Sequence, residues 1–226
     1  MKDEKDTYQQ TVDFWDDIFE NTEDSFDFEE ELPIKEIENC LDWLVDEESS
    51  IIDFGCGNGK LLFRCLAKGA KKGTGVDISS RGIKKAEKFA EQNDLEKRSD
   101  LFVGAIETLY KLEDNEFDAG ILSNIVDNLI PEDAIKLLDE FNRIIKPGGK
   151  TLLKLNDYVE PEEMESYNAE KIGENLYREE EGIYLWNLKD DDIEELLEKR
   201  FIIEKRIDVE FKEHDQINRL FYLKNR

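Results

Sequence analysis

The sequence predicts an α/β fold in which a mostly parallel sheet is covered by helices on both faces. From residue 51 onward, short apolar runs alternate with amphipathic helical patterns. The runs are almost continuously apolar, which is typical of strands buried on both faces of a parallel sheet. The last two runs, 201–211 and 217–224, are separated by so few residues that they must pair antiparallel.

The first half of this fold is predicted from four apolar runs and the helices around them. The expected strands are 51–54, 74–78, 101–105 and 117–123. A helix before the first strand carries apolar residues at helical spacing, namely Ile34, Ile37, Leu41, Leu44 and Val45. The helix at 59–68 buries Leu61, Leu62, Cys65 and Leu66, and the helix after the second strand buries Ile83, Ala86, Phe89 and Ala90.

The second half of the predicted fold begins with a helix that starts near Pro131. Proline fits the first helical turn, and Glu132 and Asp133 favour the positive end of the helix. Its apolar face consists of Ala134, Leu137, Leu138, Phe141, Ile144 and Ile145, and the sequence KPGG at 146–149 ends it. After that we expect a fifth strand at 151–155, an acidic insertion at 157–182, the apolar run GIYLWNL and a helix over Ile193, Leu196 and Leu197.

Length and composition suit one domain with an appendage. The chain has 226 residues, of which 39% are apolar, enough to build a core. We expect residues 1–48 to form an N-terminal helical segment and residues 49–226 the main domain, with an insertion at about 157–190. The acidic N-terminal stretch carries more aromatic residues than a solvated tail would, namely Tyr8, Phe14, Trp15, Phe19, Phe26 and Phe28.

The charge of the chain argues against several partners. A formal net charge of −26 repels phosphate backbones and anionic lipids, and no segment gathers the lysines and arginines that nucleic-acid binding requires. The N-terminus MKDEKD lacks the apolar core of a secretory signal, and no apolar run is long enough to span a bilayer. We therefore expect a cytoplasmic protein that binds neither nucleic acid nor membrane. The sequence leaves its oligomeric state open.

Metal binding is not expected either. The cysteines Cys40, Cys56 and Cys65 lack CxxC spacing, and the chain has one histidine, His214. The cysteines are interpreted as small buried residues in a reducing compartment.

The sequence SSIIDFGCGNGKLL places three glycines, two residues apart, directly after the first predicted strand. A strand, a glycine-rich turn and a helix commonly bind an anionic or polar ligand. A P-loop is excluded because Phe54 and Leu61 stand where its first glycine and its hydroxyl residue belong. A dinucleotide site is disfavoured because Lys60 stands where the third glycine of GxGxxG is required. A tight turn that binds nothing is the remaining structural alternative.

The pattern DxGxGxG, from Asp53 to Gly59, resembles the class I S-adenosylmethionine-dependent methyltransferases, and the resemblance extends from about residue 34 to the end of the chain. It implies a Rossmann-like, doubly wound sheet of seven strands, mostly parallel with an antiparallel C-terminal strand, and S-adenosylmethionine as the cofactor. Asp53 suits the ammonium group of the cofactor, while Gly55 and Gly57 let the main chain pass beside its methionyl part. Cys56 and Gly59 belong to the same cofactor-binding loop.

The second predicted strand supplies the next part of the cofactor site. Asp77 ends this strand 20 residues after Gly57, where a carboxylate can accept hydrogen bonds from both ribose hydroxyls. The resemblance places Ile78 against the adenine face. It also implies an acidic residue after the third strand, where this chain has Ala105 instead.

The departure at Ala105 leaves adenine recognition to Glu107 or to the main chain around Ile106. At the end of the fourth strand, the resemblance places Ser123 and Asn124 beside the cofactor sulfonium.

No catalytic residue is assigned, because the cofactor brings both the electrophile and the leaving group. His214, in a turn between the last two strands, is interpreted as a surface histidine rather than a general base. Asp127 and Asn128 either contact the methyl acceptor or form caps and turns before the Pro131 helix. Trp186 either packs in the core or lines a pocket.

The resemblance also bears on the N-terminus, where Tyr8 and Trp15 belong either to a lid over the cofactor or to a helix that packs plainly on the domain. A small molecule, neutral or cationic, is the favoured acceptor, because SNIVDN differs from the [DNS]PPY sequence of enzymes that methylate amide or base nitrogens. Protein acceptors stay open. The alternatives to an enzyme of this kind are a non-catalytic S-adenosylmethionine-binding interaction module and, less favoured, an NAD-linked oxidoreductase.

Overall fold

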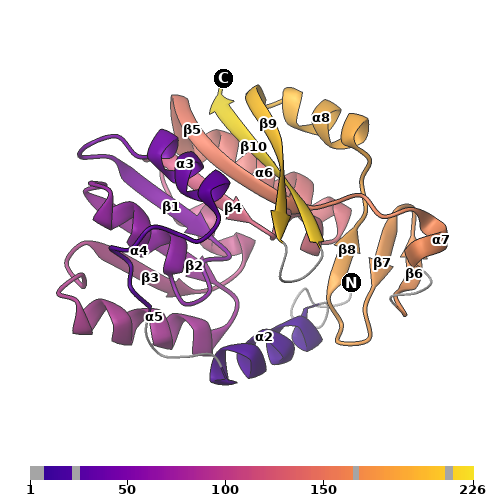
Figure 1. Ribbon diagram of the computed structural model, residues 1–226, viewed down its shortest axis with the longest axis horizontal. Helices are drawn as coiled ribbons and strands as arrows, with labels where there is room; N and C mark the ends of the chain where they lie inside the picture. Colours follow the sequence, from indigo (N-terminus) through magenta and orange to yellow (C-terminus); the bar gives the residue numbers. More distant parts are fainter. Residues whose placement is uncertain (1–7, 22–25, 165–167, 212–215) are drawn as a thin grey trace.

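The computed structural model describes residues 8–21, 26–164, 168–211 and 216–226, and its centre is a seven-stranded sheet (Figure 1). The strands lie in the order β3-β2-β1-β4-β5-β10-β9. Their bounds are β1 (Ser50–Phe54), β2 (Lys72–Asp77), β3 (Ser99–Val103), β4 (Phe117–Ser123), β5 (Ile145–Asn156), β9 (Phe201–Phe211) and β10 (Gln216–Asn225).

The directions of the strands confirm the predicted fold. The five strands from β3 to β5 pair in parallel, and β10 is antiparallel to both β5 and β9. The order of the strands reverses between β1 and β4. In open α/β sheets, ligands bind outside the carboxyl ends of the strands at such a reversal.

Helices cover both faces of the sheet because its strands alternate apolar side chains between two cores. The first face carries α3 (Lys35–Leu44), α4 (Lys60–Ala67) and α5 (Ser80–Gln92), and the second α6 (Pro131–Ile144) and α8 (Asp190–Glu198). Neighbouring residues divide accordingly, so that Ile51 packs in the first core and Ile52 in the second. Both side chains are fully buried.

The insertion forms a structure that the sequence pattern did not reveal. It builds a separate antiparallel sheet from β6 (Glu170–Gly173), β7 (Leu176–Arg178) and β8 (Tyr184–Trp186), preceded by α7 (Pro161–Met164). These strands are short, and β6 is exposed along its whole length. A strand without a buried face has no apolar alternation to predict it from.

The KPGG sequence does end α6, as expected, but it does not form a loop. It lies at the start of β5, whose pairing with β4 shifts between Phe117 and Ala119. Gly148 has a φ of +75°, which a glycine adopts without steric cost.

The helix α2 (Gln9–Asn21) lies across the carboxyl edge of the main sheet, between α5 and the insertion (Figure 1). Near one end, the Thr11 hydroxyl donates to the Gly182 carbonyl at 3.0 Å. Further along, Asp16 accepts a 2.6 Å hydrogen bond from the Ser79 hydroxyl before α5. The helix therefore bridges two parts of the chain that flank the sheet edge.

A buried ion pair fastens the segment between α2 and α3. The Arg64 guanidinium pairs with the Glu38 carboxylate and donates to the carbonyls of Phe28 and Glu29, at 3.1 Å and 2.7 Å. Burial by itself raises the pKa of Glu38, but hydrogen bonds from Arg64 and Lys68 outweigh it and lower this pKa to about 2. Glu38 is therefore ionised at neutral pH.

Two short 3-10 helices complete the described elements, η1 (Ile106–Lys111) after β3 and η2 (Val126–Asn128) after β4. Within the described ranges, no helix is both long enough and apolar enough to cross a bilayer.

Candidate functional site

The glycine loop makes a tight turn between β1 and α4. Its three glycines have positive φ angles, +80° at Gly55, +54° at Gly57 and +83° at Gly59. Side chains other than glycine rarely adopt this region, so the turn depends on glycine at each of the three positions. The loop is also tied to β2, because the N–H groups of Gly55 and Cys56 both donate to the Val76 carbonyl, at 2.8 Å and 3.1 Å.

Asp77, at the end of β2, forms a hydrogen bond with the glycine loop. One of its carboxylate oxygens accepts from the Gly57 N–H at 2.7 Å, and the other accepts from the Ser79 N–H at 2.8 Å. Burial raises the pKa of Asp77, although both backbone hydrogen bonds act in the opposite direction. Each oxygen has a second lone pair, so the carboxylate can still accept hydrogen bonds from a ligand.

Asp53, at the end of β1, is a buried acid that is not fully satisfied. Its side chain is 2% exposed, and its Oδ1 atom has no hydrogen-bond partner in the described part of the chain. Burial and the nearby charge of Asp77 raise the pKa of Asp53 to about 8. A buried carboxylate oxygen without a donor is unfavourable, so the position is suited to a ligand that brings a cation or N–H groups.

Two more polar side chains lie farther along the same edge, after β4. The N–H of Asn124 donates to the Lys154 carbonyl at 2.8 Å. Asp127 accepts from the backbone and side-chain nitrogens of Asn156, at 2.8 Å and 2.9 Å, through Oδ2. The Oδ1 atoms of Asn124 and Asp127 are buried and have no partner among the described residues.

Asp127 and Asn128 were expected either to contact the methyl acceptor or to form caps and turns before the Pro131 helix, and both lie in the turn η2. The N-cap of α6 is Ile130, and no side chain caps this helix. Asp127 bonds to Asn156 instead, and the Asn128 side chain donates to the Tyr184 carbonyl at 3.0 Å. Neither residue is the N-cap of the Pro131 helix.

Helix α2 places an aromatic ring over the glycine loop. A Cβ atom built on Gly57 would lie 2.6 Å from Cζ of Phe19, and one built on Gly82 would lie 3.0 Å from Cδ2 of the same ring. Asp16 holds the helix there through the Ser79 hydroxyl and the Arg81 N–H, the latter at 3.1 Å. The Phe19 ring therefore covers the Cα of the central loop glycine.

The start of α2 is fastened to the other half of the sheet edge. The hydroxyl of Tyr8, just before the helix, donates to the Asp133 carboxylate at 2.9 Å and accepts from the Ile130 N–H at 3.2 Å. Trp15 lies on the same helix and stacks on Phe19, with ring centroids 6.0 Å apart.

The remaining predicted residues are distributed along the same edge. Cys56 is buried, with its sulfur 3.8 Å from the Gly57 carbonyl oxygen, and Ile78 and Ser123 are half-buried. In η1, Glu107 is exposed, whereas Ile106 packs against the core. His214 lies outside the described residues.

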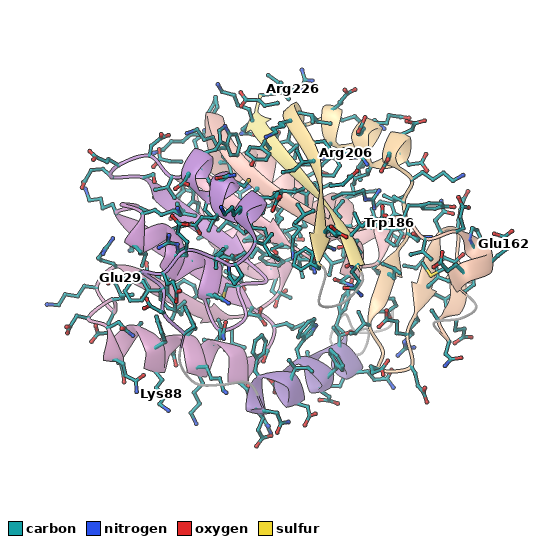
Figure 2. All side chains as sticks on the ribbon, in the orientation of Figure 1. Glu29, Lys88, Glu162, Trp186, Arg206 and Arg226 are labelled. Carbon is teal, nitrogen blue, oxygen red and sulfur yellow. The ribbon has the colours of Figure 1, made fainter. Side chains whose placement is uncertain are left out.

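Trp186 packs partly buried against the second core, at the junction between β8 and the main sheet (Figure 2). Phe19, Lys154 and Asn156 were not predicted from the sequence as site residues. Lys154 and Asn156 were detectable as polar residues at the carboxyl end of an apolar strand, whereas the position of Phe19 depends on how α2 packs.

The glycine loop and the acidic residues around it belong to a part of the chain that matches a known protein family. Residues 51–149 match the family described as "Methyltransferase domain". This part of the chain is a methyltransferase domain. The match spans β1, the glycine loop and Asp77, and extends through α6, and it confirms the resemblance to the class I S-adenosylmethionine-dependent methyltransferases.

The relatives found by sequence have low identity to this chain. The ribosomal protein L11 methyltransferase of Burkholderia mallei is 30% identical over 146 residues, which cover 63% of this chain and 45% of that protein. The chain thus spans less than half the length of this relative.

Solved structures share the fold of the domain. A 1,6-didemethyltoxoflavin-N1-methyltransferase of Burkholderia thailandensis, solved with S-adenosylhomocysteine, has a TM-score of 0.68 at 12% identity and covers 98% of this chain and 86% of its own. The [4+2]-cyclase SpnF has a TM-score of 0.66 at 18% identity, covering 84% of this chain and 80% of its own. The fold of this chain is thus found both in a protein named as a methyltransferase and in one named as a cyclase. A fold by itself therefore does not determine the reaction.

Proposed function

We propose that this protein transfers a methyl group from S-adenosylmethionine to a small-molecule acceptor, at the carboxyl edge of β1, β2 and β4. The observation that carries the proposal is the unsatisfied carboxylate of Asp53 beside a glycine loop that Asp77 holds in place. The proposed cofactor-binding residues are Asp53, Gly55, Cys56, Gly57, Gly59, Asp77, Ile78, Ile106, Glu107, Ser123 and Asn124.

The side chains at this edge fit the proposed cofactor. Its ammonium group supplies the donors and the positive charge that Asp53 lacks. The free lone pairs of Asp77 suit the ribose hydroxyls, and the absence of a Cβ at Gly57 gives room beside the main chain. Phe19 covers that same glycine, so the ring has to move aside, or become a wall of the site, when the cofactor binds.

The bound cofactor supplies the methyl electrophile and a thioether leaving group. The chain itself has to align the acceptor and exclude water. Ile125 contributes to the exclusion, since a Cβ on Gly55 would lie 3.3 Å from the Cβ of Ile125. The edge is closed from the other side by Phe19 of α2 and by Tyr8, just before this helix.

A small-molecule acceptor is favoured because α2 and the insertion cover the edge of the sheet where it would bind. With a net charge of −26, the protein attracts neutral or cationic acceptors more readily than anionic ones. A protein acceptor is the second candidate, because the named relatives act on ribosomal protein L11.

Isothermal titration calorimetry tests the cofactor site. We expect saturable binding of S-adenosylmethionine and S-adenosylhomocysteine by the wild type, and a loss of affinity of at least about tenfold in Asp77→Ala and Gly57→Val. The matched controls are Asp100→Ala, on the neighbouring strand β3, and Gly173→Val, in the insertion, both of which should bind normally. Normal affinity in all four variants contradicts the assigned site.

Two further measurements separate the rival functions. Titration with NADH, followed by its fluorescence, detects an oxidoreductase. Tight cofactor binding without methyl transfer to any component of a cell extract indicates a non-catalytic module.

A further inference from the structure

The strand β3 forms one outer edge of the main sheet, and among the described strands it pairs only with β2 (Figure 1). Its backbone hydrogen bonds show which groups are left for another strand. The Gly104 N–H and the Arg98 carbonyl both bond to β2, at 2.9 Å and 2.8 Å. Backbone groups alternate in direction along a strand, so those of Leu101 and Val103 point away from the sheet.

The side chains at this edge are apolar and exposed. Phe102 is 45% exposed, and Val103 is 55% exposed. In the part of the chain that the structure describes, β3 exposes two large apolar side chains in succession, and no other helix or strand exposes more than one. An unpaired edge with exposed apolar side chains is a template for a further strand.

The opposite edge of the same sheet is protected against such pairing. Charged side chains on an edge strand discourage pairing with another chain. The edge strand β9 has eleven residues, of which five are charged, namely Glu204, Lys205, Arg206, Asp208 and Glu210. In β3 the one charged residue is Asp100, which forms an ion pair with Lys72 of the neighbouring strand β2. The edge suited to a partner strand is therefore β3.

The helix α5 adds a charged surface beside this edge, because it contacts both β2 and β3. Its exposed face includes Lys84, Glu87, Lys88 and Glu91, which line a hollow on the surface. When the helix is turned end for end, Lys84 faces Glu91 and Lys88 faces Glu87. The charges of α5 are thus complementary to those of an antiparallel copy of the same helix.

We propose that two copies of this chain form a dimer through β3 and α5, related by a twofold axis. The two β3 strands pair antiparallel and join the sheets of both copies into one. A twofold interface uses the same surface on both subunits, so that surface has to be complementary to itself. The edge of β3 and the charges of α5 both meet this condition.

Apolar matching selects the register of the two strands. With Phe102 opposite Phe102 of the second copy, Leu101 faces Val103, and the outward backbone groups of these two residues exchange hydrogen bonds. A shift that sets Leu101 opposite its own copy would place Phe102 against Asp100. The register centred on Phe102 is therefore the favoured one.

The spacing of the elements brings the two copies of α5 into contact. Neighbouring strands lie about 4.8 Å apart, and α5 contacts both β2 and β3. The second copy of α5 then lies about 10 Å away on the same face of the joined sheet, which is a distance at which helices pack. The helices enlarge an interface that two strands of five residues each would leave small.

The net charge of −26 opposes the association of two copies, but this surface is not one of the acidic faces. The sequence of α5 contains four cations and two carboxylates. At physiological ionic strength, exposed charges more than about 8 Å apart are largely screened. The charges near the interface therefore matter more for association than the net charge.

Sedimentation velocity of the full chain at micromolar concentration tests the proposal. We expect a species of twice the mass of the chain. Phe102→Asp places two carboxylates opposite each other and should raise the dissociation constant of the dimer at least about 30-fold. The matched control is Ile202→Asp on β9, where the side chain is 48% exposed, and it should stay dimeric. Circular dichroism verifies that both variants are folded.

A cross-link tests the register without destabilising the strand. Residues that face each other across antiparallel strands have Cα atoms about 4.5–5.5 Å apart, within the range of a disulfide bond. Phe102→Cys should therefore give a disulfide-linked dimer on mild oxidation, whereas Ile202→Cys should not. The native cysteines are buried, so the wild type should give no such product.

Three results would overturn the proposal. They are a wild type that sediments as a monomer, a dimer that Phe102→Asp leaves intact, and cross-linking of Phe102→Cys that is no faster than that of Ile202→Cys. A monomer that instead binds a different protein along β3 assigns this edge to another occupant and equally contradicts the dimer.

Discussion

The ring of Phe19 lies against the Cα of Gly57, so close that a Cβ on this glycine would come within 2.6 Å of the ring. Two segments that are far apart in the sequence thus meet at the centre of the proposed cofactor site. Phe19 comes from α2, and Gly57 comes from the loop that gives the domain its sequence signature. The described conformation is therefore one in which an aromatic side chain covers the position proposed for the cofactor.

Removal of the Phe19 ring should make the cofactor bind more tightly. If the ring has to move before the cofactor enters, the apparent dissociation constant equals the intrinsic one divided by the fraction of molecules that are open. We expect Phe19→Ala to lower the dissociation constant of S-adenosylhomocysteine about threefold to tenfold, as measured by calorimetry. Phe14→Ala is the matched control, because its ring pairs with Trp15 on the same helix. Weaker binding by Phe19→Ala would show that the ring contacts the cofactor instead of blocking it.

Asp53 should make the unliganded protein less stable as the pH rises. Its folded-state pKa is raised to about 8, whereas a carboxyl in an unfolded chain titrates near 4. Between these values the folded state binds more protons than the unfolded state, so the free energy of unfolding decreases as the pH rises.

Urea denaturation at several pH values from about 5 to 8.5 measures this effect. Asp53→Asn should lose less stability than the wild type over the same range, while Asp100→Asn, on the exposed edge strand, should follow the wild type. If the free energy of unfolding changes with pH in the same way in all three proteins, the raised pKa of Asp53 is contradicted.

Cofactor binding should release a proton from Asp53 at neutral pH. An ammonium group beside the carboxylate favours its ionised form and lowers its pKa. Calorimetry at pH 7 in buffers with different enthalpies of ionisation should therefore give an apparent binding enthalpy that depends on the buffer. The same experiment with Asp53→Asn should show a smaller dependence. If the dependence is the same in both proteins, the cofactor ammonium does not lie beside Asp53.

The buried pair of Glu38 and Arg64 should contribute strongly to stability. Removing one partner leaves the other charge buried and unpaired, so we expect Glu38→Gln to lower the free energy of unfolding by about 3–5 kcal/mol. Chemical denaturation measures the change. Glu48→Gln removes the exposed partner of Lys71 and should cost less than about 1 kcal/mol. Equal effects of the two substitutions would show that burial does not distinguish the pairs.

Much of the fold could be predicted because it depends on local patterns. The predicted run 117–123 coincides with β4, and α6 ends at Ile144, just before KPGG and one residue short of the predicted Ile145, which belongs to β5. The strand–turn–helix order, the three glycines and the acidic residue at the end of β2 depend on neighbours in the chain. Such features can be predicted from the sequence because backbone conformation and burial periodicity are set within a few residues.

Other features of the molecule were decided by tertiary structure. In the small sheet, β6 has no buried residue and β7 and β8 bury one residue each, so the pairing of the strands reveals this sheet. The contact of Phe19 with Gly57 and the bonds of Asp127 to Asn156 join residues separated by 38 and 29 positions. The amino-acid sequence by itself determined the methyltransferase domain, because its signature is local. Which side chains complete or cover the site depends on long-range packing, where many aromatic or acidic residues are equal candidates until the chain is folded.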